Sequence, residues 1–197
     1  MKFLRKLYDW VLHWAETPYG PLALFLLALA ESSFFPIPPD PLLIALCLGA
    51  VKRSFHFALY TSVASVIGGS IGYLIGLGLW KAADSFFFHY IPGFTESFFQ
   101  KVMMNFHKFG FWYVFSAGFT PIPYKVFTIA SGVFELNFVL FLAASTTSRA
   151  LRFFAVAALF RKFGPEIKTF IDKYFNLLAV LFFLLLGGGF LVIRYVF

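Results

Sequence analysis

The sequence predicts an all-α integral membrane protein built as an inverted repeat, with two re-entrant helical hairpins, transmembrane helices and interfacial amphipathic helices. Of the 197 residues, 60% are hydrophobic and only 13% are charged, whereas soluble domains are about a quarter charged. Residues 54–80 and 174–193 contain no Asp, Glu, Lys or Arg. Each stretch is long enough to cross a hydrocarbon core, which requires about 20 apolar residues.

A proline-rich phrase occurs twice, as FFPIPPD at 34–40 and FTPIPYK at 119–125. The offset is 85 residues (119 − 34 = 85), and the two phrases end in opposite charges, Asp40 and Lys125. Proline lacks an N–H group and clashes with the preceding turn, so each phrase should interrupt a helix. The residues expected to break the helices are Pro36, Pro38 and Pro39 in the first phrase and Pro121 and Pro123 in the second.

Residues 1–18 are expected to form an interfacial helix, because apolar residues recur at helical spacing opposite basic and polar ones. The first repeat follows at 20–80, with a re-entrant hairpin at 21–51 and a full span at 54–80. The limbs of the hairpin would cover about 22 Å and 16 Å, both short of a core of about 30 Å. Basic residues flank the hairpin on both sides, which places both of its ends, and the N-terminus, in the cytoplasm.

The second repeat is predicted at 94–160, with an interfacial helix first, a re-entrant hairpin at 109–136 and a span at 138–160. A final span is expected at 174–195. Because one span separates the two hairpins, they should enter the membrane from opposite sides, as in transporters with inverted repeats. Two alternatives remain open: a single kinked span in place of a hairpin, and chance similarity between the two phrases.

Five charged residues fall within or beside these apolar segments: Glu31, Asp40, Lys125, Arg149 and Arg152. Charges within a bilayer are costly and usually pair or serve a function. Pairing would leave an excess of one positive charge (3 − 2 = +1), which favours an anion. We therefore predict that Lys125, Arg149 and Arg152 bind substrate and that Glu31 and Asp40 exchange protons. The alternative is that these residues pair only to hold the hairpins together.

Other functional classes find little support in the sequence. The single cysteine, Cys47, excludes an intrachain disulfide and a multi-cysteine metal site. No motif for a cofactor, a metal or a catalytic nucleophile with its base is present, so we predict no enzyme, no cofactor and no metal. The net charge of +7 gathers beside apolar runs, which indicates membrane topology rather than nucleic-acid binding. Gly68, Gly72 and Gly76 predict close helix packing.

The segments ESSFFPIPPDPLL and AGFTPIPYKVFTIASGVF, followed by a span containing SRALRF, resemble the DedA family, also called the SNARE-associated or VTT-domain superfamily. The resemblance covers roughly residues 20–160 and is strongest to the YqaA-type branch. It implies two re-entrant hairpins, transport of undecaprenyl phosphate or phospholipids, and dependence on the proton-motive force.

By position, Glu31 and Asp40 look like the family's acidic pair, and Lys125 looks like the basic residue after the second hairpin's proline. The family also places an arginine before that proline, whereas Gly118, Phe119 and Thr120 stand there in this sequence. Arg149 or Arg152 could supply the missing cation from the next helix.

Together these observations predict a flippase or scramblase that moves an anionic prenyl-phosphate or phospholipid headgroup across the bacterial inner membrane, coupled to protons. Its partners would be membrane lipids and protons, and a homo-oligomer is left open. The alternatives are a proton-coupled exporter of a small ion or solute, and a structural protein of membrane or envelope assembly.

Overall fold

The computed structural model describes residues 17–90, 95–120 and 122–164. Within these ranges the chain is helical and contains no β-strand. Three expected features lie wholly or largely outside the described residues. They are Pro121, the span at 174–195, and the interfacial helix at 1–18, of which only residues 17 and 18 are described.

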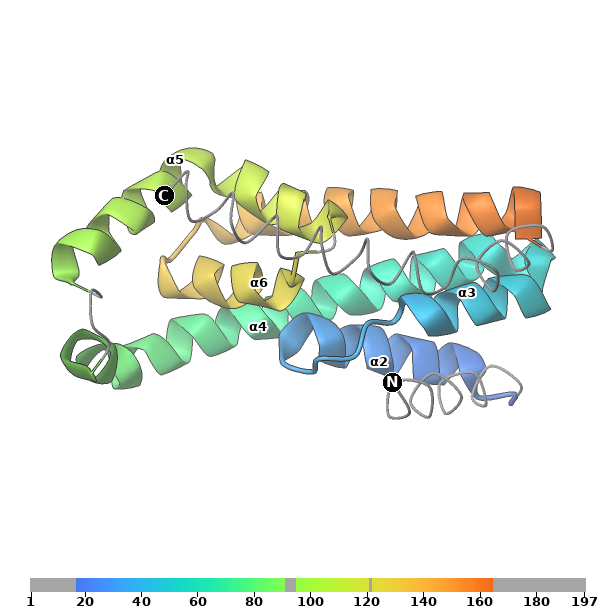
Figure 1. Cartoon of the computed structure of the whole chain (residues 1–197), viewed down its shortest axis with the longest axis horizontal. Coiled ribbons are helices and arrows are strands. Elements are labelled where there is room, and N and C mark those ends of the chain that lie inside the picture. Colours follow the sequence, from blue (N-terminus) through green and yellow to red (C-terminus); the bar gives the residue numbers. More distant parts are fainter. Residues whose placement is uncertain (1–16, 91–94, 121, 165–197) are drawn as a thin grey trace, which may run out of the picture.

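Five labelled α-helices and a short 3-10 helix precede the last described helix, which carries no label (Figure 1). Their bounds are α2 Gly20–Ser33, α3 Asp40–Gly49, η1 Val51–Arg53, α4 Ser54–Tyr90, α5 Glu96–Phe119 and α6 Tyr124–Val133, followed by the helix Phe138–Gly164.

Two long helices form the frame of the molecule: α4 and the helix Phe138–Gly164 extend along most of its long axis (Figure 1). The shorter helices form two antiparallel pairs. The pair α2–α3 begins and ends at one end of the molecule, and the pair α5–α6 begins and ends at the other. Each pair turns back near the middle of the long axis, so the two turns face each other there.

Both turns coincide with the repeated phrase, and we call residues 34–39 the first helix break and residues 120–123 the second. Helix α2 ends at Ser33 and α3 begins at Asp40, so Pro36, Pro38 and Pro39 lie between the two helices. The amides of Phe34 and Phe35 both bond to the carbonyl of Ala30, which closes the last turn of α2.

The second turn is shorter. Helix α5 ends at Phe119 and α6 begins at Tyr124, immediately after Pro123. Beyond α6 the chain turns at Glu135, whose φ is 50°. The next helix is capped by the Asn137 side chain, which accepts hydrogen bonds from two backbone amides.

Two helix boundaries differ from the expected ones. The interfacial helix expected before residue 109 and the limb expected from 109 onwards are one continuous helix, α5. No proline occurs between Glu96 and Phe119, and the shift from charged to apolar residues near 109 does not by itself end a helix. Helix α4 likewise continues past the expected end at 80 to Tyr90.

Glycines on α4 allow both short pairs to pack against the same helix. A side chain at Gly68 would strike the backbone of Leu29 in α2, and one at Gly76 would strike the backbone of Ile129 in α6. At Gly72, between them, a side chain would meet both Thr128 and the carbonyl of Ser32. The predicted close packing through this glycine face is confirmed.

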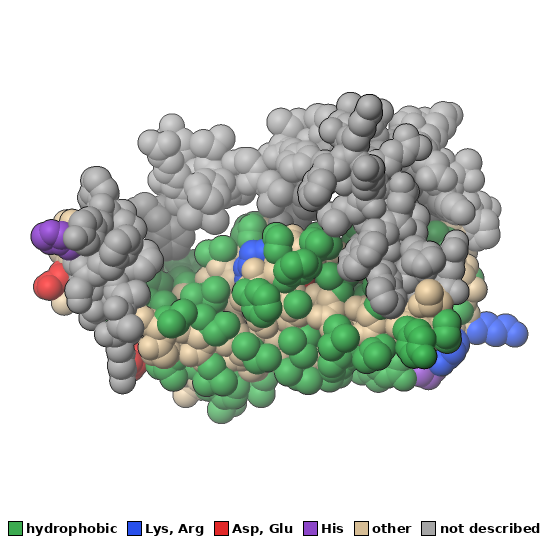
Figure 2. Space-filling view, turned by 90° about the horizontal axis from the view of Figure 1, so that it is seen from below, with side chains coloured by type: hydrophobic (Ala, Val, Ile, Leu, Met, Phe, Trp, Pro, Cys, Tyr) green, Lys and Arg blue, Asp and Glu red, His purple; other side chains and the backbone are tan. Residues whose placement is uncertain are grey.

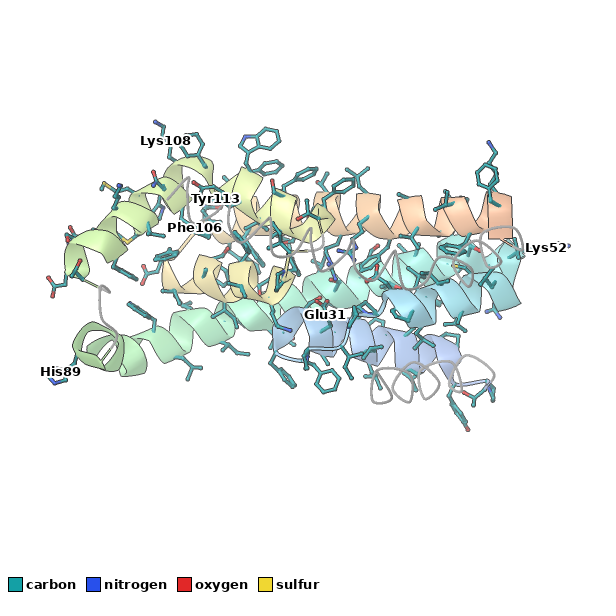
Figure 3. All side chains as sticks on the ribbon, in the orientation of Figure 1. Glu31, Lys52, His89, Phe106, Lys108 and Tyr113 are labelled. Carbon is teal, nitrogen blue, oxygen red and sulfur yellow. The ribbon has the colours of Figure 1, made fainter. Side chains whose placement is uncertain are left out.

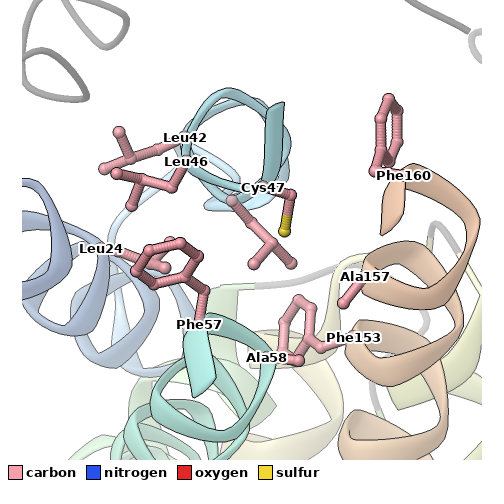
Figure 4. Packing of buried hydrophobic residues seen from close by; sticks show 10 residues of the cluster. Leu24, Leu42, Leu46, Cys47, Phe57, Ala58, Phe153, Ala157 and Phe160 are labelled. Atoms are coloured by element: carbon pink, nitrogen blue, oxygen red, sulfur yellow. The ribbon is translucent and has the colours of Figure 1, made fainter. Parts of the chain in front are cut away.

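Two hydrophobic clusters lie on either side of the central turns. The first joins α2, α3, α4 and the last described helix, and includes Leu24, Leu43, Cys47, Phe57 and Phe153 (Figure 4). The second joins α4, α5, α6 and the last described helix, and includes Tyr73, Val114, Leu136 and Phe141.

The outer surface is also apolar. Large hydrophobic side chains such as Leu74, Leu79, Trp112 and Val139 are at least 60% exposed. In the described part of the face seen in Figure 2, hydrophobic side chains predominate, while cationic atoms are visible near the middle and charged groups at the two ends. Within the described residues, Val51–Trp80 and Phe138–Gly164 are long and apolar enough to cross a membrane.

Candidate substrate site where the two helix breaks meet

The five charged residues singled out in the sequence come from four helices. Glu31 lies in the last turn of α2 and Asp40 is the first residue of α3. Lys125 is the second residue of α6, and Arg149 and Arg152 lie on the last described helix. Glu31 is labelled in Figure 3, near the middle of the long axis. Hydrogen bonds and ion pairs connect all five residues to this central region.

Arg149 and Glu31 form the more deeply enclosed of two ion pairs. Nη2 of Arg149 lies 2.9 Å from Oε2 of Glu31, and the two side chains are 3% and 13% exposed. A carboxylate and a guanidinium at this distance make a charge-assisted hydrogen bond, stronger than one between neutral groups. The pair joins α2 to the last described helix.

Two serines complete a hydrogen-bonded circuit around this ion pair. Nε of Arg149 donates to Oγ of Ser65 on α4, and Ser65 Oγ lies 2.6 Å from Ser32 Oγ. Ser32 in turn donates to Oε2 of Glu31. Since Ser32 uses its only hydroxyl hydrogen for Glu31, Ser65 must donate to Ser32. The circuit therefore satisfies every buried hydroxyl it contains while Glu31 is ionised.

The remaining surroundings of Arg149 are aromatic. The centre of its guanidinium lies 4.7 Å from the Tyr124 ring and 4.6 Å from the Phe153 ring, within cation–π range. Tyr124 and Phe153 are themselves almost fully buried. Arg149 is thus enclosed by protein groups and presents little surface to any ligand.

Arg152 and Asp40 form the second ion pair, one helical turn further on. Nη2 of Arg152 lies 2.9 Å from Oδ1 of Asp40, and the side chains are 20% and 22% exposed. Nη1 of Arg152 donates to the main-chain carbonyl of Thr120, just after α5 ends. Arg152 therefore binds the start of α3 and the second helix break at the same time.

Lys125 connects the two breaks directly. Its Nζ donates a 3.0 Å hydrogen bond to the carbonyl of Phe35, in the first break. Thr128 lies one turn further along α6, and its Oγ1 donates a 3.3 Å hydrogen bond to the carbonyl oxygen of Ser32. Among the described residues, no carboxylate lies within 4.0 Å of the Lys125 ammonium. The two acids are paired with the two arginines, and Lys125 carries the excess positive charge.

Sequence reasoning missed several members of the site. Ser65 and Ser32 fix the buried ion pair, and the carbonyls of Phe35 and Thr120 accept from Lys125 and Arg152. One signal pointed to Ser65: it lies three and seven residues before Gly68 and Gly72, and therefore on the same face of α4. The carbonyl acceptors left no signal in the sequence.

Metal binding has no support in the part of the chain that the structure describes. No group of three His, Cys, Asp or Glu side chains lies close enough together there to hold an ion. Cys47 is buried in the first hydrophobic cluster.

Comparison with known proteins identifies the family. Residues 35–162 match the family model of the VTT domain. A protein of Haemophilus influenzae, described as uncharacterised, is 36% identical over 87% of this chain and 90% of its own length. An uncharacterised protein of Histophilus somni is 37% identical over 87% of this chain and 91% of its own length. No solved structure matches the chain.

The matched region contains the second helix break, all of the first except Phe34, and Asp40, Lys125 and both arginines of the site, whereas Glu31 lies four residues before it. The chain therefore belongs to the VTT-domain family of membrane proteins, also called the DedA or SNARE-associated family.

Proposed function

We propose that this membrane protein is a transporter that moves an anionic lipid headgroup across the bilayer through the junction of the two helix breaks. The observation that carries the proposal is the position of Lys125. It is a cation without a carboxylate partner among the described residues, and it lies where two interrupted helix pairs meet.

The lengths of α2 and α3 favour a re-entrant hairpin for the first helix pair. Helix α2 has 14 residues and α3 has 10, so they cover about 21 Å and 15 Å of a hydrocarbon core of about 30 Å. The start of α2 and the 3-10 helix η1 lie at the same end of the molecule (Figure 1). A chain with this path enters the membrane, turns at the middle and leaves on the side it entered.

The breaks also favour an inverted repeat. Adding the 85-residue offset to Ser33 and Asp40 gives 118 and 125, each within one residue of the end of α5 and the start of α6. Helices α3 and α6 both contain 10 residues. The two pairs approach the centre from opposite ends of the molecule, an arrangement found in transporters that bind substrate at the midplane.

Irregular backbone within a bilayer is tolerated only if it is buried in protein or lines a polar cavity. Here Lys125 and Arg152 each donate to a carbonyl exposed by one of the breaks. These two cations therefore lie where a polar path for a headgroup would have to run. Arginine offers several donors for phosphate oxygens, and lysine adds a concentrated charge.

The structure changes the roles that we propose for the three cations. Lys125 and Arg152 are partly exposed and can contact a headgroup directly. Arg149 is enclosed by Glu31, Ser65 and two aromatic rings. We therefore assign phosphate binding to Lys125 and Arg152, and assign to Arg149 the task of holding α2 against the last described helix.

Proton coupling would act through the carboxylates. Protonation of Asp40 would remove the partner of Arg152 and raise the excess charge from +1 to +2. Protonation of Glu31 would do the same for Arg149, but inside a buried circuit. Since neutralising Asp40 increases the attraction for an anion beside the partly exposed Arg152, uptake of a proton by Asp40 and of a headgroup would favour each other.

The charge distribution suggests the orientation. Lys52, Arg53, Arg161 and Lys162 lie near the start of α4 and the end of the last described helix, at one end of the molecule. Basic ends favour the cytoplasmic side. In a bacterial inner membrane, the α2–α3 pair would then enter from the cytoplasm and the α5–α6 pair from the opposite side.

Reconstituted vesicles test the proposal. Fluorescently labelled phosphatidylglycerol and phosphatidylcholine would be followed by quenching of the outer leaflet with dithionite. We expect the protein to speed the movement of phosphatidylglycerol more than that of phosphatidylcholine, and more strongly with an inward proton gradient. No acceleration of either lipid contradicts lipid transport, and substrate-dependent proton movement in the same vesicles would indicate a small-solute exporter instead.

A further inference from the structure

The arginines of the two ion pairs lie three residues apart on one helix, yet the two pairs differ in how exposed their side chains are. The side chains of the Glu31–Arg149 pair are 13% and 3% exposed, and those of the Asp40–Arg152 pair are 22% and 20% exposed. The N···O distance is 2.9 Å in both pairs. The difference therefore lies in their surroundings and not in the contact itself.

Arg149 cannot exchange its partner without breaking several other contacts. Its Nε bonds to Ser65, its Nη2 bonds to Glu31, and rings lie within cation–π range. Separating the pair would leave a buried charge without compensation, which is among the most destabilising changes a protein can undergo. The Glu31–Arg149 pair is a fixed clamp.

Arg152 makes fewer contacts than Arg149. Its Nη2 bonds to Asp40 and its Nη1 to a main-chain carbonyl, which is neutral. Among the described residues, Asp40 is thus the only anion paired with Arg152, and both side chains are partly exposed. A phosphate oxygen, like a carboxylate oxygen, is an anionic acceptor with which a guanidinium forms charge-assisted hydrogen bonds, so it can take the place of Asp40 at this guanidinium.

We propose, resting on the function proposed above, that Asp40 is an internal counter-ion that occupies the headgroup's place on Arg152 until the lipid anion displaces it. The Glu31–Arg149 pair stays intact during this exchange. The ligand class is an anionic phosphate ester on an amphiphile, held between Arg152 and Lys125. Return of Asp40 to Arg152 then helps to expel the headgroup.

This assignment gives the two acidic residues opposite effects on binding. Removing the charge of Asp40 removes a competitor of the substrate, so the headgroup should bind more tightly but leave more slowly. Removing the charge of Glu31 removes no competitor and loosens the clamp. A residue that only supports the fold would not tighten binding when its charge is removed.

Binding of radiolabelled dodecyl phosphate to the purified full chain in dodecyl maltoside, measured by scintillation proximity, tests the proposal. For Asp40→Asn we expect binding at least about tenfold tighter, since a charge-assisted hydrogen bond no longer has to be broken. Asp40→Ser is measured in parallel, because serine and asparagine both suit a helix N-terminus and preserve the start of α3. The exposed Glu135→Gln serves as the matched acidic control and should not change binding.

The outcomes separate the two proposals. If the wild-type chain binds dodecyl phosphate but both Asp40 variants bind it equally or more weakly, the counter-ion role is wrong and the proposed function stands. If the wild-type chain does not bind the probe, the proposed function itself is contradicted. Excess inorganic phosphate that displaces the probe completely would indicate a site for free phosphate, whereas weak displacement indicates a lipid headgroup.

Transport in vesicles gives the second readout. With phosphatidylglycerol as substrate, Asp40→Asn should lower both KM and kcat, because tight binding is followed by slow release. Glu31→Gln should lower kcat without lowering KM. An Asp40→Asn variant with raised KM would overturn the proposal.

Discussion

Lys125 of α6 donates a 3.0 Å hydrogen bond from Nζ to the carbonyl oxygen of Phe35, 90 positions earlier in the chain. Phe35 belongs to the non-helical segment between α2 and α3, and Lys125 follows the break between α5 and α6. One side chain thus connects the two proline-containing interruptions. Its positive charge is paired with neither Glu31 nor Asp40, since each of these acids is paired with an arginine.

Replacing Lys125 should impair transport more than it impairs folding. Lys125→Gln removes the unpaired charge but keeps a hydrogen-bond donor for the carbonyl of Phe35. We expect the rate of phosphatidylglycerol movement to fall about tenfold or more, as is typical when a charged hydrogen-bond donor to an anion is lost. Lys125→Arg should retain a large part of the rate.

The control for this variant is Lys108→Gln, which removes an exposed lysine from α5 outside the site. Both variants would be assayed in the same vesicles and compared at equal protein content. An unchanged rate for Lys125→Gln would exclude Lys125 from headgroup binding.

The buried ion pair should contribute most to stability. Glu31→Gln leaves the Arg149 guanidinium enclosed with no carboxylate partner and replaces the charged acceptor of Ser32 and Arg149 with a neutral amide. Loss of one partner of a buried pair costs about 3–5 kcal/mol. Thermal unfolding of the purified protein in detergent should therefore shift to a clearly lower midpoint.

The comparison variant is Asp40→Asn, since the Asp40–Arg152 pair is the more exposed of the two. We expect its midpoint to lie closer to that of the wild type. Equal shifts for the two variants would show that enclosure does not distinguish the ion pairs.

The glycine face of α4 offers a test of packing within one helix. Gly76→Ala places a methyl group against the backbone of Ile129 in α6, which cannot move without displacing that helix. Gly78 lies on the same helix, and a methyl group added there would meet no atom of the neighbouring helices within 4 Å. We expect Gly76→Ala to lower the unfolding midpoint and to slow transport.

Gly78→Ala should be neutral or stabilising by about 0.5–1 kcal/mol, because alanine favours helix over glycine. The two variants differ only in position, so helix propensity cancels in the comparison. Similar midpoints for both would mean that α6 does not pack closely against α4.

The broad features of this fold were open to prediction because each has a strong local cause. Proline interrupts a helix wherever it falls, so the repeated phrase fixed the place of both turns in the chain. Glycines at every fourth position predicted the face of α4 that receives the neighbouring helices, as found for Gly68, Gly72 and Gly76. The length of an uncharged run similarly predicted a helix that can span a membrane.

The pairing within the site was beyond such reasoning. The sequence predicts that both Arg149 and Arg152 belong to the central site. Which acid each arginine binds, however, depends on the rotation and depth of three separate helices. The same holds for Ser65, whose role depends on its contact with Arg149. The continuity of α5 past residue 109 has another cause: the change in polarity there comes without a proline, so the helix does not end.

The path of the chain relative to the membrane tests the central claim most directly. Single cysteines would be introduced by Tyr19→Cys, Lys52→Cys, Glu96→Cys and Glu135→Cys, all at exposed positions near the outer ends of the helix pairs. The native Cys47 is buried and should not react. A membrane-impermeant maleimide would then be applied to intact cells and to inside-out vesicles.

If the two helix pairs are re-entrant hairpins that enter from opposite sides, cysteines at 19 and 52 react from one side of the membrane, and those at 96 and 135 react from the other. A continuous kinked span would instead place 19 and 52 on opposite sides. That result would contradict the account of a common central site.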